Sequence, residues 1–396
     1  MLTYKFRLYP SKKQEENLLW TLDKCRYVYN FLLSELQRQK VIDKAQIQGL
    51  LPDLKIVEPE LNEVYSKTLQ YECYRLFSNL RALSQSKKNK RKIGNLRFKC
   101  KGWFKTFTYN QSGFKIIKTK KRCQILHLSK IGSIRIRCHR NIKSKIKQIT
   151  IKKEISGRWY ALITEEREEI VKKKPIKKVV GIDLGLVDIV YDSEGNKIKN
   201  PRHLNKQEER LNLLQKRLSV KKKRSNNRNK ARIKVAKQYE KIKNTRNDFL
   251  HKLSRYYVDN YDAIGIEDLQ ICNMVYNKHL SKSILDASWG KFKQFISYKA
   301  ERAGKIVVPV NHKGTTQRCS QCGNKVEKKI WNRKHKCLSC NFETPRDYNS
   351  ALEIKRLMLI EIGQGLSEFK PAETALAAEL NNKVYESSVK EAGSLL

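Results

Sequence analysis

Four cysteines in the last third of the 396-residue chain have the spacing of a metal site: Cys319, Cys322, Cys337 and Cys340. Two Cys-x-x-Cys pairs can hold four thiolates tetrahedrally around Zn²⁺ at about 2.3 Å. Gly323 follows the first pair, where a tight turn must aim backbone amides at the sulfurs. Because four thiolates leave no open position for water, we expect a structural Zn²⁺. His335 is surplus to such a site, and we expect it at the surface.

Three carboxylates form a second group of candidate ligands. Asp183 closes the apolar run 179–183, Glu267 closes the run 263–267, and Asp347 begins a helix directly after the cysteine module. A carboxylate at the end of a buried strand is costly unless it meets a cation. We therefore expect the three acids to converge on two Mg²⁺ ions about 3.5–4 Å apart, which would activate water and stabilise the leaving oxygen of a phosphodiester. Taken singly, each acid is more simply a solvated strand end or a helix cap.

Three neighbours of these acids invite weaker predictions. Gly181 and Gly185 flank Asp183 and would let a nucleic-acid backbone pass close to the strand. Asn349 follows Asp347 by two positions and could support a metal-bound water, although a plain position on the helix face is the favoured interpretation.

The chain is strongly basic. Its 85 Lys and Arg exceed its 39 Asp and Glu, leaving a net charge of +46 that repels itself unless a polyanion neutralises it. Nucleic acid is the leading candidate, and an acidic membrane surface is the weaker one. The segment 216–246 contains fourteen Lys or Arg and one acid, a bias that argues against a merely solvated helix face. From it we select Lys222, Arg224 and Lys230 as candidate nucleic-acid contacts.

A second basic stretch, 97–105, is rich in aromatic residues and suited to stacking bases and gripping phosphates. Arg97 and Lys99 are its candidate contacts. Trp103 and Phe104 could equally belong to the core of a barrel.

The elements that must position these residues follow from hydrophobic periodicity. Residues 2–9 alternate as a strand, and a helix with a capping box at Ser11 and Gln14 follows. A second helix is expected at about 61–83, and short strands fill 103–164. We expect a small barrel that the first strand completes, with the two helices as an insertion.

The second half alternates strands and helices, which indicates an α/β domain. Strands are expected at 179–183, near 188–191, at 263–267 and at 306–310, and a long helical region at 205–260. The length suggests two to four domains. Apolar runs long enough to span a bilayer and a secretory signal are not recognised, and the six remaining cysteines are scattered. We therefore expect a cytoplasmic protein without a membrane partner.

The ordered motifs resemble the TnpB family, transposon-encoded RNA-guided nucleases related to type V CRISPR effectors, also called the OrfB family. The resemblance covers residues 1 to about 360. Its motifs are Lys5-Phe-Arg-Leu-Tyr-Pro10, Cys25-Arg-Tyr-Val-Tyr-Asn30, Arg97-Phe-Lys99, Phe107-Thr-Tyr109, Gly181-Ile-Asp-Leu-Gly185, His251-Lys-Leu-Ser254, Ile266-Glu-Asp-Leu269, Thr315-Thr-Gln-Arg-Cys-Ser-Gln-Cys-Gly323 and Arg346-Asp-Tyr-Asn-Ser-Ala351.

The resemblance implies a mixed α+β multidomain fold. A wedge-type β-barrel carries an inserted helical recognition domain, and a RuvC-like, ribonuclease H-type α/β nuclease carries an inserted zinc ribbon. The implied boundaries are 1–10 and 95–172 for the barrel, 11–94 for the recognition insertion, 173–313 and 342–362 for the nuclease, 314–341 for the zinc finger, and 363–396 for a partly disordered tail.

The resemblance also implies a function. Asp183, Glu267 and Asp347 would be the catalytic triad on two Mg²⁺ ions, with Zn²⁺ held by the cysteines. One protein would bind one guide RNA from the transposon end and cut double-stranded target DNA beside a short adjacent motif, promoting retention of the element. On target it would be associated with the nucleoid of a prokaryotic cell.

Two departures and several alternatives remain. The family often has an acid where this chain has Pro345 and an Ala where it has Ser350, and neither change removes a ligand. Tyr29, Asn30 and Gln70 are candidates for reading the adjacent motif, with helix packing as the favoured alternative for each. An RNA-guided binder or repressor without cleavage and a strand-transferring transposase are the rival functions.

Overall fold

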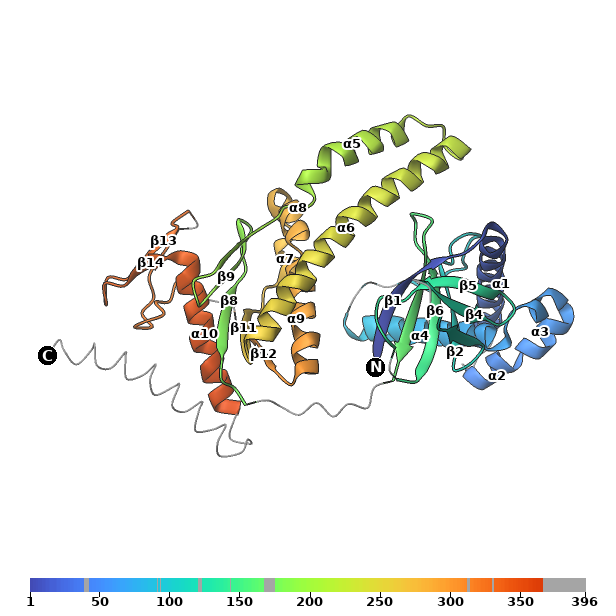
Figure 1. The fold of residues 1–396 in the computed structure, drawn as a ribbon, viewed down its shortest axis with the longest axis horizontal. Coiled ribbons are helices and arrows are strands. Elements are labelled where there is room, and N and C mark those ends of the chain that lie inside the picture. Colours follow the sequence, from blue (N-terminus) through green and yellow to red (C-terminus); the bar gives the residue numbers. More distant parts are fainter. Residues whose placement is uncertain are drawn as a thin grey trace. The chain divides into compact units, whose positions relative to one another are not determined.

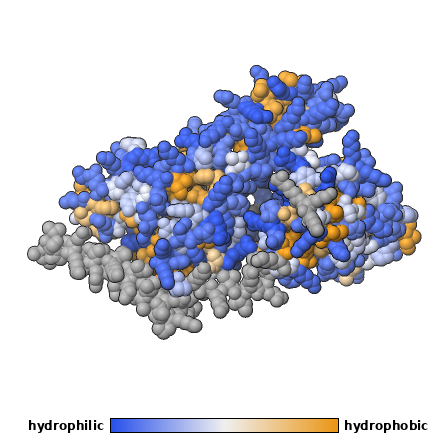
Figure 2. Space-filling view, viewed as in Figure 1, coloured by the Kyte–Doolittle hydropathy of each residue, from blue (hydrophilic) through white to orange (hydrophobic). Residues whose placement is uncertain are grey.

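The computed structural model describes the chain except for residues 39–42, 91, 93, 120–122, 143, 167–174, 312–313, 330 and 366–396. It divides into two compact units, Met1–Glu169 and Ile170–Leu396. The predicted boundary at 172/173 lies outside the described residues, as does most of the predicted tail. Hydrophilic side chains cover most of the face shown in Figure 2, and hydrophobic ones appear on it in separate groups.

The first unit is built on one antiparallel sheet (Figure 1). Its order is β2-β6-β7-β1-β5-β4-β3. The strands are β1 (Leu2–Tyr9), β2 (Thr106–Asn110), β3 (Phe114–Ile117), β4 (Gln124–Leu128), β5 (Gly132–Arg137), β6 (Ile146–Lys153) and β7 (Trp159–Glu165). The first strand pairs with β7 on one side and β5 on the other, so it lies inside a sheet formed mostly by residues a hundred positions later. The prediction that the N-terminal strand joins this sheet agrees with that pairing.

The sheet is curled but its ends are not paired. The two edge strands are β2 and β3, and the described residues show no ladder between them, so the predicted small barrel takes the form of a curled sheet that stays open between these edges. Alternate residues such as Phe6, Leu8 and Ile163 point into one buried face, as the period of two requires. Tyr109 on edge strand β2 donates its hydroxyl to Ser129 O at 2.6 Å, beyond the end of β4, which holds the curl.

Helices of the first unit cover this face. They are α1 (Lys12–Arg38), α2 (Lys44–Gly49), α3 (Leu51–Val57), the short 3₁₀ helix η1 (Pro59–Glu63) and α4 (Ser66–Lys88). The capping box is present, because Ser11 N donates to Gln14 Oε1 at 2.9 Å and Gln14 N to Ser11 Oγ at 3.3 Å. The sequence analysis did not predict α2 and α3, which are too short to show a clear helical period.

The second unit contains a five-stranded sheet of order β10-β9-β8-β11-β12. Its strands are β8 (Val179–Asp183), β9 (Asp188–Asp192), β10 (Lys197–Lys199), β11 (Ala263–Glu267) and β12 (Ile306–Val310). Strands β8, β11 and β12 are parallel, whereas β9 and β10 run antiparallel to their neighbours. A separate two-stranded ribbon, β13 (Lys334–Lys336) with β14 (Glu343–Pro345), belongs to the cysteine module.

Helices lie on both faces of this sheet (Figure 1). The described helices of the second unit are α5 (Asn205–Ser219), α6 (Asn226–Asn260), α7 (Ile271–Met274), α8 (Lys278–Ala287), α9 (Trp289–Ala303) and α10 (Arg346–Gly365). Among them, α5 packs against α6. Val180 and Ile182 of β8 join one core with α6 and α9, while Val179 joins the opposite core with α10. The predicted helical region at 205–260 contains two helices, α5 and α6, and α8 and α9 meet at Ser288, whose φ is +55°.

Glycine on β8 serves packing, which corrects the prediction that it admits a nucleic-acid backbone. A Cβ at Gly181 would lie 2.2 Å from Ala351 O and 2.5 Å from Lys355 N of α10. A Cβ at Gly185 would lie 2.5 Å from Asp188 O in the tight β8–β9 connection. Both glycines therefore leave room for this chain's own backbone.

Candidate active site and metal centre

Two of the three predicted acids end neighbouring parallel strands. Asp183 is the last residue of β8 and Glu267 the last of β11, and the register pairs the residues just before them, Ile182 with Ile266. Because successive side chains alternate, both acids share the phase of Gly181 and point to the face that α10 covers. Both are buried, with 8% and 6% of their surface exposed.

The third acid comes to the same place from the helix. Asp347 lies in the first turn of α10, one turn before the residues that pack on Gly181. Its side chain is 36% exposed and pairs with Arg346, whose guanidinium lies 3.1 Å from Oδ1. A carboxylate is favoured at this end of a helix by the helix dipole.

The pKa of Asp183 is shifted by both of the other acids, which places all three in one region of the fold. Burial raises the pKa of Asp183 well above its ordinary value, and the charges of Glu267 and then Asp347 raise it further, while Arg346 opposes them. Buried like charges disfavour ionisation unless a cation joins them. Carboxylate oxygens are the ligands that Mg²⁺ prefers. The residues present therefore fit a divalent metal site.

The three acids do not share one tight coordination shell. Among the described residues, one group of three or more Cys, His, Asp or Glu has ligand atoms that all lie within 4.8 Å of one another, and it is the cysteine group. Ligands of a single Mg²⁺ lie about 2.1 Å from the ion, so they lie within roughly 4.2 Å of one another. The wider spacing is compatible with ligands shared between two ions.

A hydroxyl contacts one of the acids. Thr315 Oγ1 donates to Glu267 Oε1 at 2.7 Å, and Thr315 itself is buried. The sequence analysis quoted Thr315 within a family motif without giving it a role. No pattern in the sequence around Thr315 indicates that it contacts a strand 48 positions earlier.

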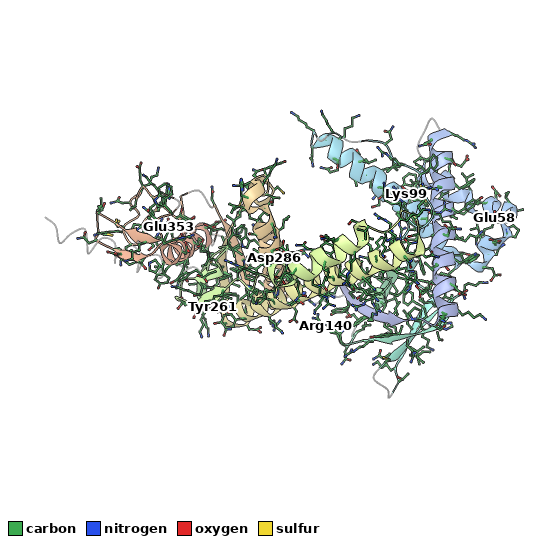
Figure 3. The ribbon with its side chains drawn as sticks, turned by 90° about the horizontal axis from the view of Figure 1, so that it is seen from above. Glu58, Lys99, Arg140, Tyr261, Asp286 and Glu353 are labelled. Carbon is green, nitrogen blue, oxygen red and sulfur yellow. The ribbon has the colours of Figure 1, made fainter. Side chains whose placement is uncertain are left out.

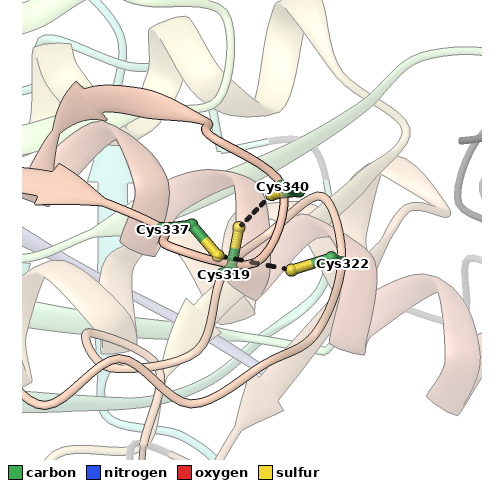
Figure 4. Close-up of side chains that lie close together, drawn as sticks. All are labelled: Cys319, Cys322, Cys337 and Cys340. Carbon is green, nitrogen blue, oxygen red and sulfur yellow. Dashed lines mark hydrogen bonds between the residues drawn. The ribbon is translucent and has the colours of Figure 1, made fainter. Parts of the chain in front are cut away.

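The four cysteines are gathered as their spacing predicts (Figure 4). Cys319 Sγ lies 3.6 Å from Cys340 Sγ, and Cys322 Sγ lies 3.5 Å from Cys337 Sγ. Four sulfurs placed tetrahedrally at about 2.3 Å from Zn²⁺ would be about 3.8 Å apart. The group therefore fits a tetrahedral thiolate metal site.

The two Cys-x-x-Cys turns have the same backbone form. Gly323 follows the first pair with φ +76°, and Asn341 follows the second with φ +56°, a match that the spacing alone does not reveal.

The backbone amides of the second turn also act on a thiol. Burial raises the pKa of Cys337, but the amides of Cys340 and Ser339 and the neighbouring thiols outweigh it and lower this pKa to about 7. Burial instead raises the pKa values of Cys319 and Cys340, so Cys337 is the thiol of this group that deprotonates most readily for a metal.

Two residues near the cysteines differ from expectation. His335 is buried rather than at the surface, and its Nδ1 contacts Lys328 Nζ. Burial and then the Lys328 charge lower the pKa of His335 to about 4, so its ring is neutral. Asn349 is also buried: its Oδ1 accepts from Ser320 N at 3.0 Å and its Nδ2 donates to Arg318 O at 2.7 Å. It fastens the first cysteine turn to α10 and is not a plain helix-face residue.

The predicted readers of an adjacent motif have structural contacts. Tyr29 is 1% exposed, with its hydroxyl 3.3 Å from Asn79 Nδ2. Asn30 donates to Lys99 O at 3.0 Å and accepts from Lys99 N at 2.8 Å. Gln70 is half-buried and lines a cavity of about 790 Å³ among α2, α3 and α4. Helix packing accounts for Tyr29 and loop anchoring for Asn30, whereas Gln70 faces a cavity.

The predicted basic contacts lie at the surface. Arg97, Lys222, Arg224 and Lys230 are exposed, and Lys99 is half-buried beside α1 (Figure 3). Trp103 is 66% exposed with Lys99 Nζ 5.5 Å from its ring centre, whereas Phe104 is half-buried against Tyr29. The two aromatic residues therefore divide between surface and core. In the described parts of the chain, every helix is too short or too polar to cross a bilayer.

Three family models match the chain. Residues 162–278 match one described as "Probable transposase", residues 289–354 match "Cas12f1-like, TNB domain", and residues 1–40 match "Helix-turn-helix domain". The described residues of the last span form strand β1 followed by the single helix α1.

Similar curated proteins cover most of the chain. "Putative RNA-guided DNA endonuclease InsQ" of Escherichia coli (strain K12) is 29% identical, over 89% of this chain and 90% of its own length. A "Putative RNA-guided DNA endonuclease" of Streptomyces pristinaespiralis is 30% identical, over 89% of this chain and 88% of its own. "CRISPR-associated endodeoxyribonuclease Cas12f1" of Sulfoacidibacillus thermotolerans is 31% identical, over half of each chain.

Proposed function

We propose that this chain, which belongs to the TnpB family, is an RNA-guided DNA endonuclease. Two relatives that match it over nearly nine tenths of its length carry that description. The observation that carries the proposal is the placement of three acids. Asp183, Glu267 and Asp347 come from two strand ends and a helix start, and the latter two raise the pKa of the first.

The second unit supports a RuvC-like nuclease of the ribonuclease H type. Its sheet has three strands in antiparallel succession, β8 to β10, followed by two strands parallel to β8. Asp183 and Glu267 lie at the carboxyl ends of adjacent parallel strands, where ligand sites of open α/β sheets are found. In the proposed division, nuclease segments 173–313 and 342–362 enclose a zinc finger at 314–341.

Asp183, Glu267 and Asp347 would hold two Mg²⁺ ions, and the four cysteines would hold a structural Zn²⁺. When bound, such Mg²⁺ ions lower the pKa of water and neutralise charge on a phosphodiester. The role of this chain's own residues is to hold the three carboxylates in place. Thr315 donates a hydrogen bond to Glu267, Asp347 lies at the start of α10, and Arg346 balances part of the negative charge.

The basic surface supports binding of a guide RNA and a DNA target. A net charge of +46 and exposed Lys222, Arg224 and Lys230 offer contacts to phosphates without sequence preference. Base pairing with the guide would then select the target, beside a short adjacent motif read by the first unit. Cutting of the site that the element has left would promote its retention, with one protein per RNA.

Cleavage of a matched plasmid tests the proposal. The protein is purified with its RNA, the bound RNA is sequenced, and a plasmid matching its variable segment is added with Mg²⁺. We expect the wild-type complex to cut both strands of this plasmid. Asp183→Ala should lower the cleavage rate by more than roughly 100-fold, which is the upper range for loss of a residue that only supports a metal ligand. Asp188→Ala, on neighbouring strand β9, is the matched control and should cut normally.

The rival functions give different results. A matched target that is bound tightly by the wild-type complex but never cut would favour a repressor. Cleavage that survives ribonuclease treatment during purification, with 3′ ends joined to new DNA, would favour a transposase. Either result would overturn the proposal.

A further inference from the structure

The turn that leads into the first cysteine pair contacts two of the three elements that carry the candidate metal-binding acids. Residues 314–318 form this turn, with Gln317 N and Arg318 N donating to Gly314 O at 3.0 and 2.9 Å. On one side, Thr315 contacts Glu267 of β11. On the other side, Asn349 of α10 binds the backbone at Arg318 and Ser320. The cysteine module is thus connected by short hydrogen bonds to two of the three candidate metal-binding elements.

We infer that Thr315 is a positioning residue for Glu267, one that fixes the rotation of its carboxylate for a divalent cation. The inference rests on the proposed nuclease function, because it gives the Glu267 carboxylate a metal to bind. A carboxylate oxygen has two lone pairs, so Oε1 can accept from the hydroxyl and still offer the second lone pair. Hydrogen bonds of this kind orient metal-ligating carboxylates and tune their affinity.

The surroundings of the Thr315–Glu267 hydrogen bond favour a role in orienting the Glu267 carboxylate. Thr315 is 1% and Glu267 6% exposed, so water has little access to compete for the bond. Glu267 also lies beside Asp183, whose charge repels it. The hydroxyl donor 2.7 Å from Oε1 constrains the rotation of the Glu267 carboxylate about its last bond.

Two substitutions of Thr315 separate the hydroxyl from the packing of its methyl group. Thr315→Val keeps the shape and removes the donor, and Thr315→Ser keeps the donor and removes the methyl. Thr316→Val is the matched control, because the neighbouring residue lies on the same turn but is exposed. Each variant is purified as full-length protein, and its Mg²⁺ or Mn²⁺ affinity is measured by calorimetry in the absence of DNA. The RNA-bound complexes are then assayed for cleavage across a Mg²⁺ titration.

We expect Thr315→Val to raise the Mg²⁺ concentration for half-maximal binding and cleavage by about 10-fold or more, with activity restored at high Mg²⁺. Thr315→Ser and Thr316→Val should stay within about 3-fold of wild type. An unchanged Mg²⁺ dependence in Thr315→Val would overturn the inference, as would equal defects in the Val and Ser variants. If no protein cuts DNA but Thr315→Val still weakens metal binding, the inference stands and the proposed function fails.

Discussion

The cysteine group and the acid group are two candidate metal sites of one unit, and they are built differently. The cysteines come from a short segment, and their sulfurs lie within 4.8 Å of one another. The acids come from β8, β11 and α10, and their oxygens are spread more widely. A site made from neighbouring residues is shaped by local turns, whereas a site made from distant ones requires the whole sheet first.

The two groups also differ in what they cost without metal. Thiols can stay protonated and neutral when no cation is bound. Asp183 is buried beside two other carboxylates, so its ionised form destabilises the metal-free fold. The comparison therefore predicts that metal preserves structure at the cysteines and relieves repulsion at the acids.

The largest effect should follow loss of a cysteine ligand. Cys322→Ser should release Zn²⁺ and expose the segment 314–345 to proteolysis, because binding of a structural Zn²⁺ contributes about 10–16 kcal/mol to small metal-dependent folds. Zinc content by mass spectrometry and limited proteolysis measure this. Cys272→Ser, an exposed cysteine outside the group, is the control. Full zinc content in Cys322→Ser would contradict the assignment.

The acid group should respond in the opposite direction. Asp183→Asn should raise the melting temperature of the metal-free protein near pH 7. The substitution removes a buried carboxyl group whose ionisation is opposed by burial and by two neighbouring acids. A gain of a few kcal/mol would correspond to roughly 2–4 °C per kcal/mol. Adding Mg²⁺ should stabilise the wild type and not the variant. A lower melting temperature for Asp183→Asn without metal, with Asp188→Asn unchanged, would count against convergence of the acids.

A buried carboxylate without acidic neighbours sharpens the comparison. Glu72 of α4 is fully buried, and burial raises its pKa to about 8 despite Arg75, whose guanidinium lies 3.1 Å away. Its folded pKa exceeds the ordinary value of 4.5, so its contribution to stability is fully present below pH 4.5 and is lost as pH rises towards 8.

Glu72→Gln should therefore flatten the fall in stability between about pH 4.5 and 8, by up to a few kcal/mol. Denaturant unfolding of the first unit at several pH values measures it. Mg²⁺ should leave this difference unchanged, because Glu72 has no partner acids among the groups that shift its pKa. A Mg²⁺-dependent difference would erase the distinction between the two kinds of buried acid.

The sequence points to the candidate ligands but not to the residues that contact and support them. Four cysteines at fixed spacing and acids at the ends of apolar runs are visible without a fold, because spacing and periodicity are local. The hydrogen bonds of Thr315 and Asn349 were not predicted, because a hydrogen bond between distant segments leaves no periodic signal. Gly181 was misinterpreted for the same reason: the backbone that approaches it belongs to α10, 170 positions later.

The first unit teaches a similar lesson. Alternation of apolar residues predicted the positions of the strands. It could not predict whether the two ends of the sheet pair, because the edges of a sheet depend on twist and on the turns between strands. Tyr29 and Asn30 carry polar atoms that suggest recognition, yet one lies in the core and the other holds the loop at Lys99. Residue type alone cannot separate such roles.

Helix α6 takes part in two cores that do not merge. Near its start, Val235 and Ile242 pack with Leu211 of α5, and near its end Leu250 and Tyr257 pack with the sheet. The first cluster is much the smaller of the two, so its opening free energy is lower. The tip of the α5–α6 hairpin should therefore open at a lower free energy than the sheet that carries Asp183 and Glu267.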